Sequence, residues 1–251
     1  MMILDKITKL IKQNGIIKTI RLIFKYPYSI WKRRNFEKRL VALDTTENRF
    51  TWIYKSNYWG NAESLSGTGS TLEYTENLRK ELPKLITDFN IKSILDAPCG
   101  DFHWMKALLP TLNVNYIGAD IVEDLVHLHN SNYKNNTIEF IKLNLITDNF
   151  PYADLMICRD CLFHLSYEDI QSVLTNFKNS EIPYILTTTH KINNLFQNKD
   201  IQTGDFRTID LFSYPFNFPK KPLFRIVDSV SQEEGREMCL FSREQILSIE
   251  L

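Results

Sequence analysis

The chain has 251 residues, of which 43% are apolar and 24% are charged, and its 30 basic residues balance its 30 acidic residues. This length and apolar content allow one α/β core with an extension, whereas two full domains would be crowded. No run of about 18 apolar residues occurs and the N-terminus lacks a signal-peptide pattern, so we expect no transmembrane helix and a cytoplasmic location. Cys158 and Cys161 have no second Cys-x-x-Cys to complete a zinc site, so we expect no metal.

The balanced total charge hides a basic segment at the start of the chain. Residues 1–39 hold eleven Lys and Arg residues and two acidic residues, a net charge of +9, and the remainder carries −9. Apolar residues at helical spacing predict two short amphipathic helices, at about 3–11 and 16–24, within a basic helical arm that covers 1–49. Gly15 and Pro27 should break this arm into pieces. Its basic face suits three partners: the acidic body of the same chain, an anionic membrane surface, or nucleic acid.

Residues 50–70 form a polar, aromatic and glycine-rich segment before the main fold. Its glycines allow movement and its aromatic side chains can exclude water, so the segment is a candidate lid over a substrate. Tyr54, Asn57 and Trp59 are its candidate substrate-binding residues. Ordinary packing of the aromatic side chains against the N-terminal arm is the alternative.

Beyond residue 70 the hydrophobic pattern alternates between the helical period and the strand period. This alternation predicts an α/β fold with a Rossmann-like, doubly wound and mostly parallel sheet over 71–251. The expected helices are 71–89, 102–109, 122–130 and 167–179, and the expected strands are 93–96, 114–120, 138–143, 153–158 and 184–189.

The most informative stretch is SILDAPCGDFHW at 93–104, which is followed by YIGAD at 116–120. One apolar strand ends on Asp96 and enters a turn that contains Gly100, and the next strand ends on Asp120. An open parallel sheet places that turn and the end of the second strand on one rim, where nucleotide-like ligands bind. Gly100 lets the backbone approach a ligand, and Asp120 can accept hydrogen bonds from two ribose hydroxyls.

The turn does not suit a pyrophosphate. A dinucleotide site needs Gly-x-Gly-x-x-Gly because the pyrophosphate rests on bare backbone amides, but only Gly100 remains of those three glycines. Asp96 and Asp101 would also repel an anion, whereas they would attract a ligand with an amino group and a sulfonium. A βαβ unit of this kind that binds no cofactor is the alternative.

This stretch resembles the first motif of the class I S-adenosylmethionine-dependent methyltransferases, in which an acidic residue ends strand one and a glycine-containing loop follows. The resemblance implies S-adenosyl-L-methionine as the cofactor, with Asp96, Ala97 and Gly100 at its methionine part. It places Asp120 at the ribose, with Ile121 beside it.

The same resemblance extends to the rest of the sheet. In that fold a C-terminal antiparallel hairpin completes a seven-stranded sheet, and the apolar patches 224–230 and 237–241 fit its two strands. Asn144 ends strand three and Leu145 follows it. We expect both at the adenine, because a side-chain amide can donate to and accept from the adenine edge. Family members often have Asp at this position.

Three further motifs resemble one subset of that family. They are Tyr-x-x-Asn-x-Trp-Gly at 54–60, Arg-Asp-Cys-Leu-x-His-Leu at 159–165 and Thr-Gly-Asp-Phe-Arg at 203–207. Some members of the subset are linked to bacterial surface polysaccharides and to O-methyl phosphoramidate decoration of capsules. The resemblance therefore implies a small-molecule, nucleotide-linked or glycan acceptor.

The loops after strands four and five hold the candidate catalytic residues. His164 is the candidate general base for a hydroxyl acceptor, because an ordinary histidine pKa suits proton removal near neutral pH, and Asp160 can orient or replace it. For an anionic acceptor, Arg159 and Arg207 could form bidentate contacts. Arg159 is also a candidate cofactor-binding residue. His190 is a further candidate at the acceptor. Structural roles for His164 and for both arginines are the alternatives.

Three functions remain open from the sequence. The first is O-methylation of a small molecule or glycan. The second is nucleic-acid methylation with the basic arm as an anchor, although the loop after strand four lacks the Asn/Asp-Pro-Pro-aromatic pattern of base-methylating enzymes. The third is a cofactor-binding protein without catalysis. The oligomeric state cannot be inferred from these patterns.

Overall fold

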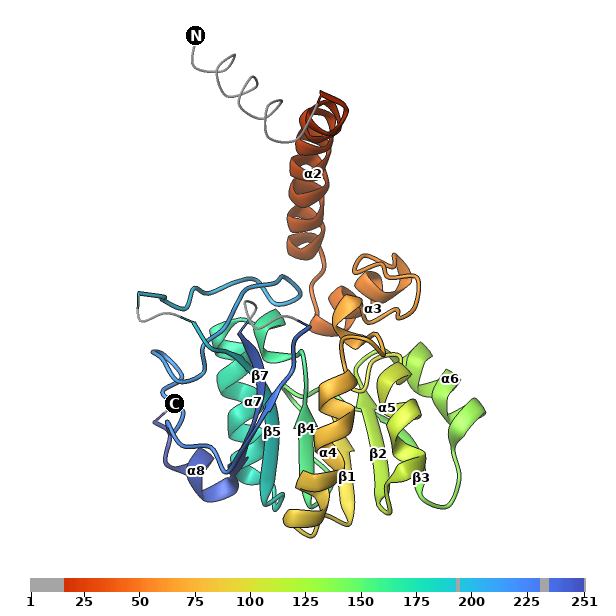
Figure 1. The fold of residues 1–251 in the computed structure, drawn as a ribbon, viewed down its shortest axis with the longest axis vertical. Helices are drawn as coiled ribbons and strands as arrows, with labels where there is room; N and C mark the ends of the chain where they lie inside the picture. The colour runs from red at the N-terminus through yellow and green to blue at the C-terminus, as the bar shows by residue number, and fades with distance from the viewer. Residues whose placement is uncertain (1–15, 193–194, 231–234, 251) are drawn as a thin grey trace. The chain divides into compact units, whose positions relative to one another are not determined.

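The computed structural model describes residues 16–192, 195–230 and 235–250, and its contacts group the chain into two compact units, Met1–Asp44 and Thr45–Leu251. In the first unit, helix α2 spans Ile16–Ala42 without interruption and contains Pro27 (Figure 1). The expected break at Pro27 is therefore wrong. Proline removes one backbone hydrogen bond, but the bonds on both sides of it can carry the helix through. The expected helix at 3–11 lies outside the described residues.

The second unit is built on a seven-stranded sheet with the order β3-β2-β1-β4-β5-β7-β6. Strands β1 to β5 pair in parallel, and β7 runs antiparallel to both β5 and β6. The mostly parallel sheet and its C-terminal antiparallel hairpin are thereby confirmed. The strands are β1 Ser93–Asp96, β2 Asn115–Asp120, β3 Ile138–Lys142, β4 Leu155–Cys158, β5 Tyr184–His190, β6 Phe224–Val227 and β7 Arg236–Ser242.

Helices cover both faces of this sheet (Figure 1). Helices α4 Glu76–Asp88, α5 His103–Leu108 and α6 Glu123–Tyr133 cover one face, and α7 Tyr167–Asn179 and α8 Arg243–Leu247 cover the other. Helix α3 Thr46–Lys55 lies beyond the carboxyl ends of the strands. Three single 3₁₀ turns, η1 Thr68–Ser70, η2 Leu109–Thr111 and η3 Leu162–His164, lie between them. Within the described residues, none of the helices combines the length and the apolar character that crossing a bilayer requires.

Two hydrophobic cores flank the sheet because successive strand residues point to opposite faces. In β1, Ile94 packs with α4 and α5, whereas its neighbour Leu95 packs with α7 and α8. In β4, Ile157 joins the first core and Met156 the second. Strands buried on both faces read as continuous apolar runs, which is why the central strands were visible in the sequence.

Two short helices differ from the sequence-based expectation. The helix α3 crosses the division expected at residue 49, and Thr45 caps it by accepting a hydrogen bond from the Asn48 amide. The helix α8 begins with a capping box in which Ser242 and Gln245 exchange side-chain and backbone hydrogen bonds. Both signals were present in the sequence, but each marks a helix of ten residues or fewer, for which periodicity is weak evidence.

The topology determines where a site can form. Strand β1 lies between β2 and β4, so the chain leaves the two neighbouring strands β1 and β4 in opposite directions along the sheet. In open parallel sheets, ligands bind at this switch point, outside the carboxyl ends of the strands. Asp96, Asp120 and Arg159 stand at or directly after the ends of β1, β2 and β4.

Candidate functional site

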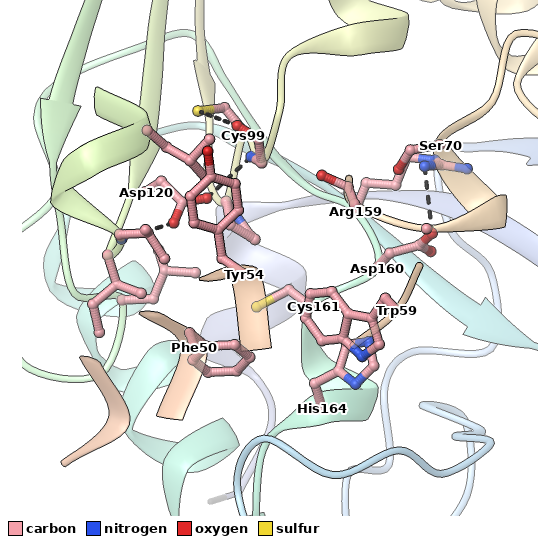
Figure 2. Close-up of a pocket in the computed structure, with 18 of the residues that line it drawn as sticks. Phe50, Tyr54, Trp59, Ser70, Cys99, Asp120, Arg159, Asp160, Cys161 and His164 are labelled. Atoms are coloured by element: carbon pink, nitrogen blue, oxygen red, sulfur yellow. Dashed lines mark hydrogen bonds and ion pairs between the residues drawn. The ribbon is translucent and has the colours of Figure 1, made fainter. Parts of the chain in front are cut away.

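A cavity of about 340 Å³ opens at the carboxyl ends of β1, β2, β3 and β4. It is lined by side chains from these strand ends, from α3 and from the segment 59–70 (Figure 2). Its lining includes eleven residues expected at the cofactor or acceptor from the sequence: Tyr54, Trp59, Asp96, Gly100, Asp120, Ile121, Asn144, Leu145, Arg159, Asp160 and His164.

Asp120 connects the end of β2 to the turn after β1. Its Oδ2 accepts a hydrogen bond from the Gly100 amide at 3.0 Å, and its Oδ1 accepts one from the Val122 amide at 2.9 Å. Burial raises the pKa of Asp120 to about 6, although these backbone hydrogen bonds act to lower it. Each carboxylate oxygen retains a lone pair, so the group can still accept hydrogen bonds from a ligand.

Asp96 is the second buried carboxyl group in the cavity. The Tyr116 hydroxyl donates a hydrogen bond to its Oδ2 at 2.7 Å. Burial raises the pKa of Asp96 to about 7, while the Tyr116 hydrogen bond and the charge of Arg159 act to lower it. A cationic ligand beside Asp96 would favour the ionised form and would itself be stabilised.

The segment 61–70, which we call the strap, is held against the turn after β1. Asp101 Oδ2 accepts hydrogen bonds from the Ser64 hydroxyl at 2.8 Å and from the Leu65 amide at 2.7 Å. Gly100 adopts a φ of 54°, and a Cβ placed on it would lie 2.4 Å from Ser66 Oγ. Glycine is therefore required here both by the left-handed backbone and by the close approach of the strap.

Four charged side chains form a closed ring of ion pairs on another side of the cavity, and three of them, Arg159, Asp228 and Arg236, are buried, whereas Asp160 is partly exposed. Asp228 Oδ2 lies 3.0 Å from Arg159 Nε and 3.0 Å from Arg236 Nη2. Asp160 Oδ2 lies 3.3 Å from Arg159 Nη1 and 3.1 Å from Arg236 Nη1. Burial raises the pKa of Asp160, but the two guanidinium groups outweigh burial, and its pKa lies below the ordinary value. Two positive and two negative charges cancel, so this ion-pair ring has no net charge.

His164 lines the cavity and stacks on Trp59, with ring centroids 4.8 Å apart (Figure 2). Its Nδ1 is 2.7 Å from the backbone carbonyl oxygen of Asp205. A carbonyl oxygen only accepts, so Nδ1 carries the proton of the neutral ring and Nε2 keeps its lone pair. Burial lowers the pKa of His164, against the effects of the Asp205 carbonyl and the Asp160 carboxylate.

Four other expected residues do not line the cavity. Ala97 is buried in the sheet, and its amide donates to the Ile157 carbonyl oxygen. Asn57 lies in the turn after α3 with a φ of 47°. His190 is buried, and its Nδ1 lies 3.1 Å from the Ile209 carbonyl oxygen. Arg207 is buried, with its guanidinium over the Tyr167 ring.

Several cavity residues were missed by the sequence reasoning. Arg236 starts β7 and Phe206 lies within the Thr-Gly-Asp-Phe-Arg motif, yet both line the cavity. Trp104 also lines it, below the Arg159 guanidinium. Asp228 completes the ion-pair ring from a position after β6. Arg236 and Asp228 reach the other strand ends only through an antiparallel hairpin, which leaves no motif in the sequence, whereas Trp104 and Phe206 lie within motifs that could have indicated them.

The four cysteines, Cys99, Cys158, Cys161 and Cys239, are buried free thiols. Over the described ranges, no group of three or more His, Cys, Asp or Glu side chains is arranged to hold a metal ion.

Neither the known family models nor the curated protein sequences match this chain. Solved structures do. Human N-acetylserotonin methyltransferase in complex with SAM aligns with a TM-score of 0.56 and 14% identity over 80% of this chain and 60% of that one. Magnesium protoporphyrin IX methyltransferase from Synechocystis with bound SAH aligns with a TM-score of 0.52 and 11% identity over 77% and 93% of the two chains. The methyltransferase domain of bacterial CtHen1 aligns with a TM-score of 0.51 and 14% identity over 67% of this chain and 99% of that one.

These similarities define the class of fold. The chain has the Rossmann-like fold of class I S-adenosylmethionine-dependent methyltransferases. It spans 60% of the length of the human enzyme and nearly all of the bacterial CtHen1 methyltransferase domain. Because one fold serves many functions, the reaction has to be argued from the residues of the cavity.

Proposed function

We propose that the chain is an S-adenosylmethionine-dependent methyltransferase that methylates a hydroxyl oxygen of a small molecule or glycan precursor. The observation that supports it most is the pair of buried carboxyl groups, Asp96 and Asp120, at neighbouring strand ends in one cavity. Arg159 and Arg236 are the Lys and Arg side chains among the described residues of the lining, and both are neutralised within the ion-pair ring. A cavity with this charge favours a cationic ligand over a pyrophosphate.

The donors and acceptors present fit this cofactor. We assign Asp96 to its amino group and Asp120 to its ribose hydroxyls, since both carboxylates can accept further hydrogen bonds. Ile121, Asn144 and Leu145 line the cavity beyond Asp120, where an adenine ring would lie. When bound, the cofactor supplies a methyl group on a positively charged sulfur. The protein positions the acceptor and excludes water, which accounts for much of the acceleration in transfers of this kind.

His164 is the proposed general base. Its Nδ1 proton is held by the Asp205 carbonyl, so Nε2 is the nitrogen that can take the proton of an acceptor hydroxyl. The lowered pKa keeps the ring neutral, and so able to accept a proton, at physiological pH. Asp160 is a weaker base than the sequence suggested, because it is paired with both Arg159 and Arg236. We assign it to the support of the site.

The ion-pair ring has no net charge, and this favours a neutral acceptor over an anionic one. An anionic acceptor such as a phosphate or phosphoramidate oxygen would need an unpaired cation at the point of transfer, but Arg159 donates to Asp228 and to the Gly69 carbonyl oxygen. A neutral hydroxyl needs no such cation. The aromatic surfaces of Trp59, Phe163 and Phe206 beside His164 suit the flat or apolar face of a sugar or an aromatic ring. A sugar of a surface polysaccharide, as the motif resemblance implies, would meet both conditions.

The basic arm fits a peripheral role. Residues 1–39 carry a net charge of +9 and alternate apolar with basic positions. Such a segment can rest on an anionic membrane surface from the cytoplasmic side. Contact with the acidic body of the same chain and anchoring to nucleic acid are the competing roles. Anchoring to nucleic acid predicts binding that weakens steeply with salt.

The function is tested by transfer of a labelled methyl group from S-adenosylmethionine to fractionated pools of small metabolites, polysaccharide precursors and RNA. We expect label in an alkali-stable methyl ether of a small molecule or glycan fraction. We expect His164→Gln to abolish transfer while the chain still binds S-adenosylhomocysteine. Label confined to RNA would support the nucleic-acid alternative, and binding without transfer to any pool would support the non-catalytic one.

A further inference from the structure

A second segment, Thr203–Arg207, holds His164 and its neighbour Phe163 in place through three hydrogen bonds. The Gly204 amide donates to the His164 carbonyl oxygen at 2.8 Å, and the Asp205 carbonyl oxygen accepts from the imidazole Nδ1 at 2.7 Å. The Arg207 amide donates to the Phe163 carbonyl oxygen at 3.1 Å. Both the backbone and the ring of His164 are therefore fixed by a segment that begins about 40 residues later in the chain.

The Arg207 side chain adds a contact with Leu165, the residue that follows His164. Its Nη1 donates to the Leu165 carbonyl oxygen at 2.5 Å, and its guanidinium carbon lies 5.2 Å from the centroid of the Tyr167 ring. The backbone and the side chain of Arg207 thus form hydrogen bonds with the residues directly before and after His164. Thr203 holds the start of the same segment, because its hydroxyl accepts from the Ser166 amide and donates to Asp169.

Packing alone does not explain why an arginine occupies position 207. Its Nε and Nη2 are buried and have no hydrogen-bond partner within the described part of the chain. Buried unpaired donors destabilise a protein, and a methionine would fill similar space against Tyr167 without that penalty. The guanidinium is thus better explained by what its Nη1 does for the loop that carries His164.

We infer that Arg207 is a positioning residue that keeps the His164 ring in the Nδ1–H tautomer with Nε2 free toward the cavity. This inference rests on the proposed role of His164 as the base. It also replaces the expectation that Arg207 contacts an anionic acceptor, since the guanidinium is outside the cavity lining. Arg207 acts through the Leu165 carbonyl and the Asp205 segment, and it touches no reacting atom.

The test is long-range ¹H–¹⁵N NMR of the full chain, which identifies the protonated nitrogen of each histidine ring without any acceptor. In the unmodified chain we expect a single Nδ1–H tautomer for His164, assigned by its loss in His164→Gln. Arg207→Met should add the Nε2–H tautomer and shift the pKa of His164 upward toward its ordinary value, because the ring is released and a nearby positive charge is removed. Arg207→Lys, which keeps a charged donor, should retain most of the single tautomer.

Arg243 provides a matched control. Its side chain also donates to backbone carbonyls, those of Ser180 and Lys178, each at 2.7 Å. Arg243→Met should lower the melting temperature and leave the His164 signals unchanged, whereas Arg207→Met should change the His164 signals with little change in melting temperature. If Arg207→Met does not fold, Thr203→Val releases the same segment and should produce the same second tautomer.

The inference would be overturned if the His164 ring stayed in one tautomer with an unchanged pKa in Arg207→Met. If Arg207→Met does not fold, the same result in Thr203→Val would overturn it. Full methyl transfer in Arg207→Met despite the tautomer shift, or no transfer by the unmodified chain, would instead contradict the proposed function and leave the positioning role intact.

Discussion

Asp120 accepts a hydrogen bond from the Gly100 amide at 3.0 Å and thereby joins the end of β2 to the turn after β1. One carboxylate therefore shapes the loop and faces the cavity at the same time. The strap reaches the same turn from the other side, because Asp101 holds Ser64 and Leu65. The proposed cofactor site is thus assembled from three segments that are far apart in sequence.

Asp120→Ala should weaken the binding of S-adenosylhomocysteine by about tenfold to a hundredfold, because hydrogen bonds to a charged group contribute roughly 1.5 to 3 kcal/mol. Isothermal titration calorimetry measures this change. Asp154→Ala is the matched control, since Asp154 also accepts two backbone hydrogen bonds, from Lys92 and Ser93, but outside the cavity lining. Equal losses of affinity in both variants would mean that Asp120 acts only through stability.

The affinity for S-adenosylhomocysteine should rise with pH between about 6.5 and 7.5. Burial holds the pKa of Asp96 near 7, so the carboxyl group is largely neutral below that pH and ionised above it. Only the ionised form attracts the amino group of the ligand, so affinity grows as the proton leaves. Asp96→Asn keeps an acceptor for the Tyr116 hydroxyl but cannot ionise. It should flatten the pH dependence, and a slope that survives in this variant would assign it to another group.

Asp228→Asn should lower the melting temperature by roughly 6 to 20 °C. Breaking a buried ion pair costs about 3 to 5 kcal/mol, and each 1 kcal/mol shifts the melting temperature of a chain of this size by about 2 to 4 °C. Asp228 is fully buried and pairs with both Arg159 and Arg236. Asp124→Asn is the control. It removes one member of the exposed ion pair between Lys55 and Asp124 and should change the melting temperature little. Comparable shifts would show that the ion-pair ring is not a stabilising unit.

Deletion of residues 1–44 should leave the affinity for S-adenosylhomocysteine unchanged, because every described residue of the cavity lining lies after residue 44. The same deletion should remove binding to vesicles that contain anionic lipid, measured by co-sedimentation. Uncharged phosphatidylcholine vesicles serve as the control, because the basic residues have little electrostatic attraction to them. Unchanged co-sedimentation after the deletion would contradict the membrane role of the arm.

Much of the fold was predictable because its signals are local. The buried parallel strands read as short apolar runs that end on polar residues, and Asp96, Asp120 and Asn144 could be placed at one rim from strand order alone. The path of α2 through Pro27 was not predictable, because a proline signals the lost hydrogen bond but not whether the flanking turns compensate for it.

The acceptor side was less accessible to sequence reasoning. The ion-pair ring joins Arg159 and Asp160 to Asp228 and Arg236, which lie about 70 residues later. Such contacts depend on how the β6–β7 hairpin docks on β5, and single residues do not encode that geometry. Arg207 was also expected at the acceptor, but its Nη1 donates to the Leu165 carbonyl oxygen, a contact between two distant loops that the sequence does not reveal.

The central claim is that this cavity binds S-adenosylmethionine, and calorimetric titration of the full chain with S-adenosylhomocysteine tests it most directly. We predict binding of one molecule per chain that competes with S-adenosylmethionine, with no comparable heat from NADH. Binding of NADH without measurable binding of S-adenosylhomocysteine would contradict the claim.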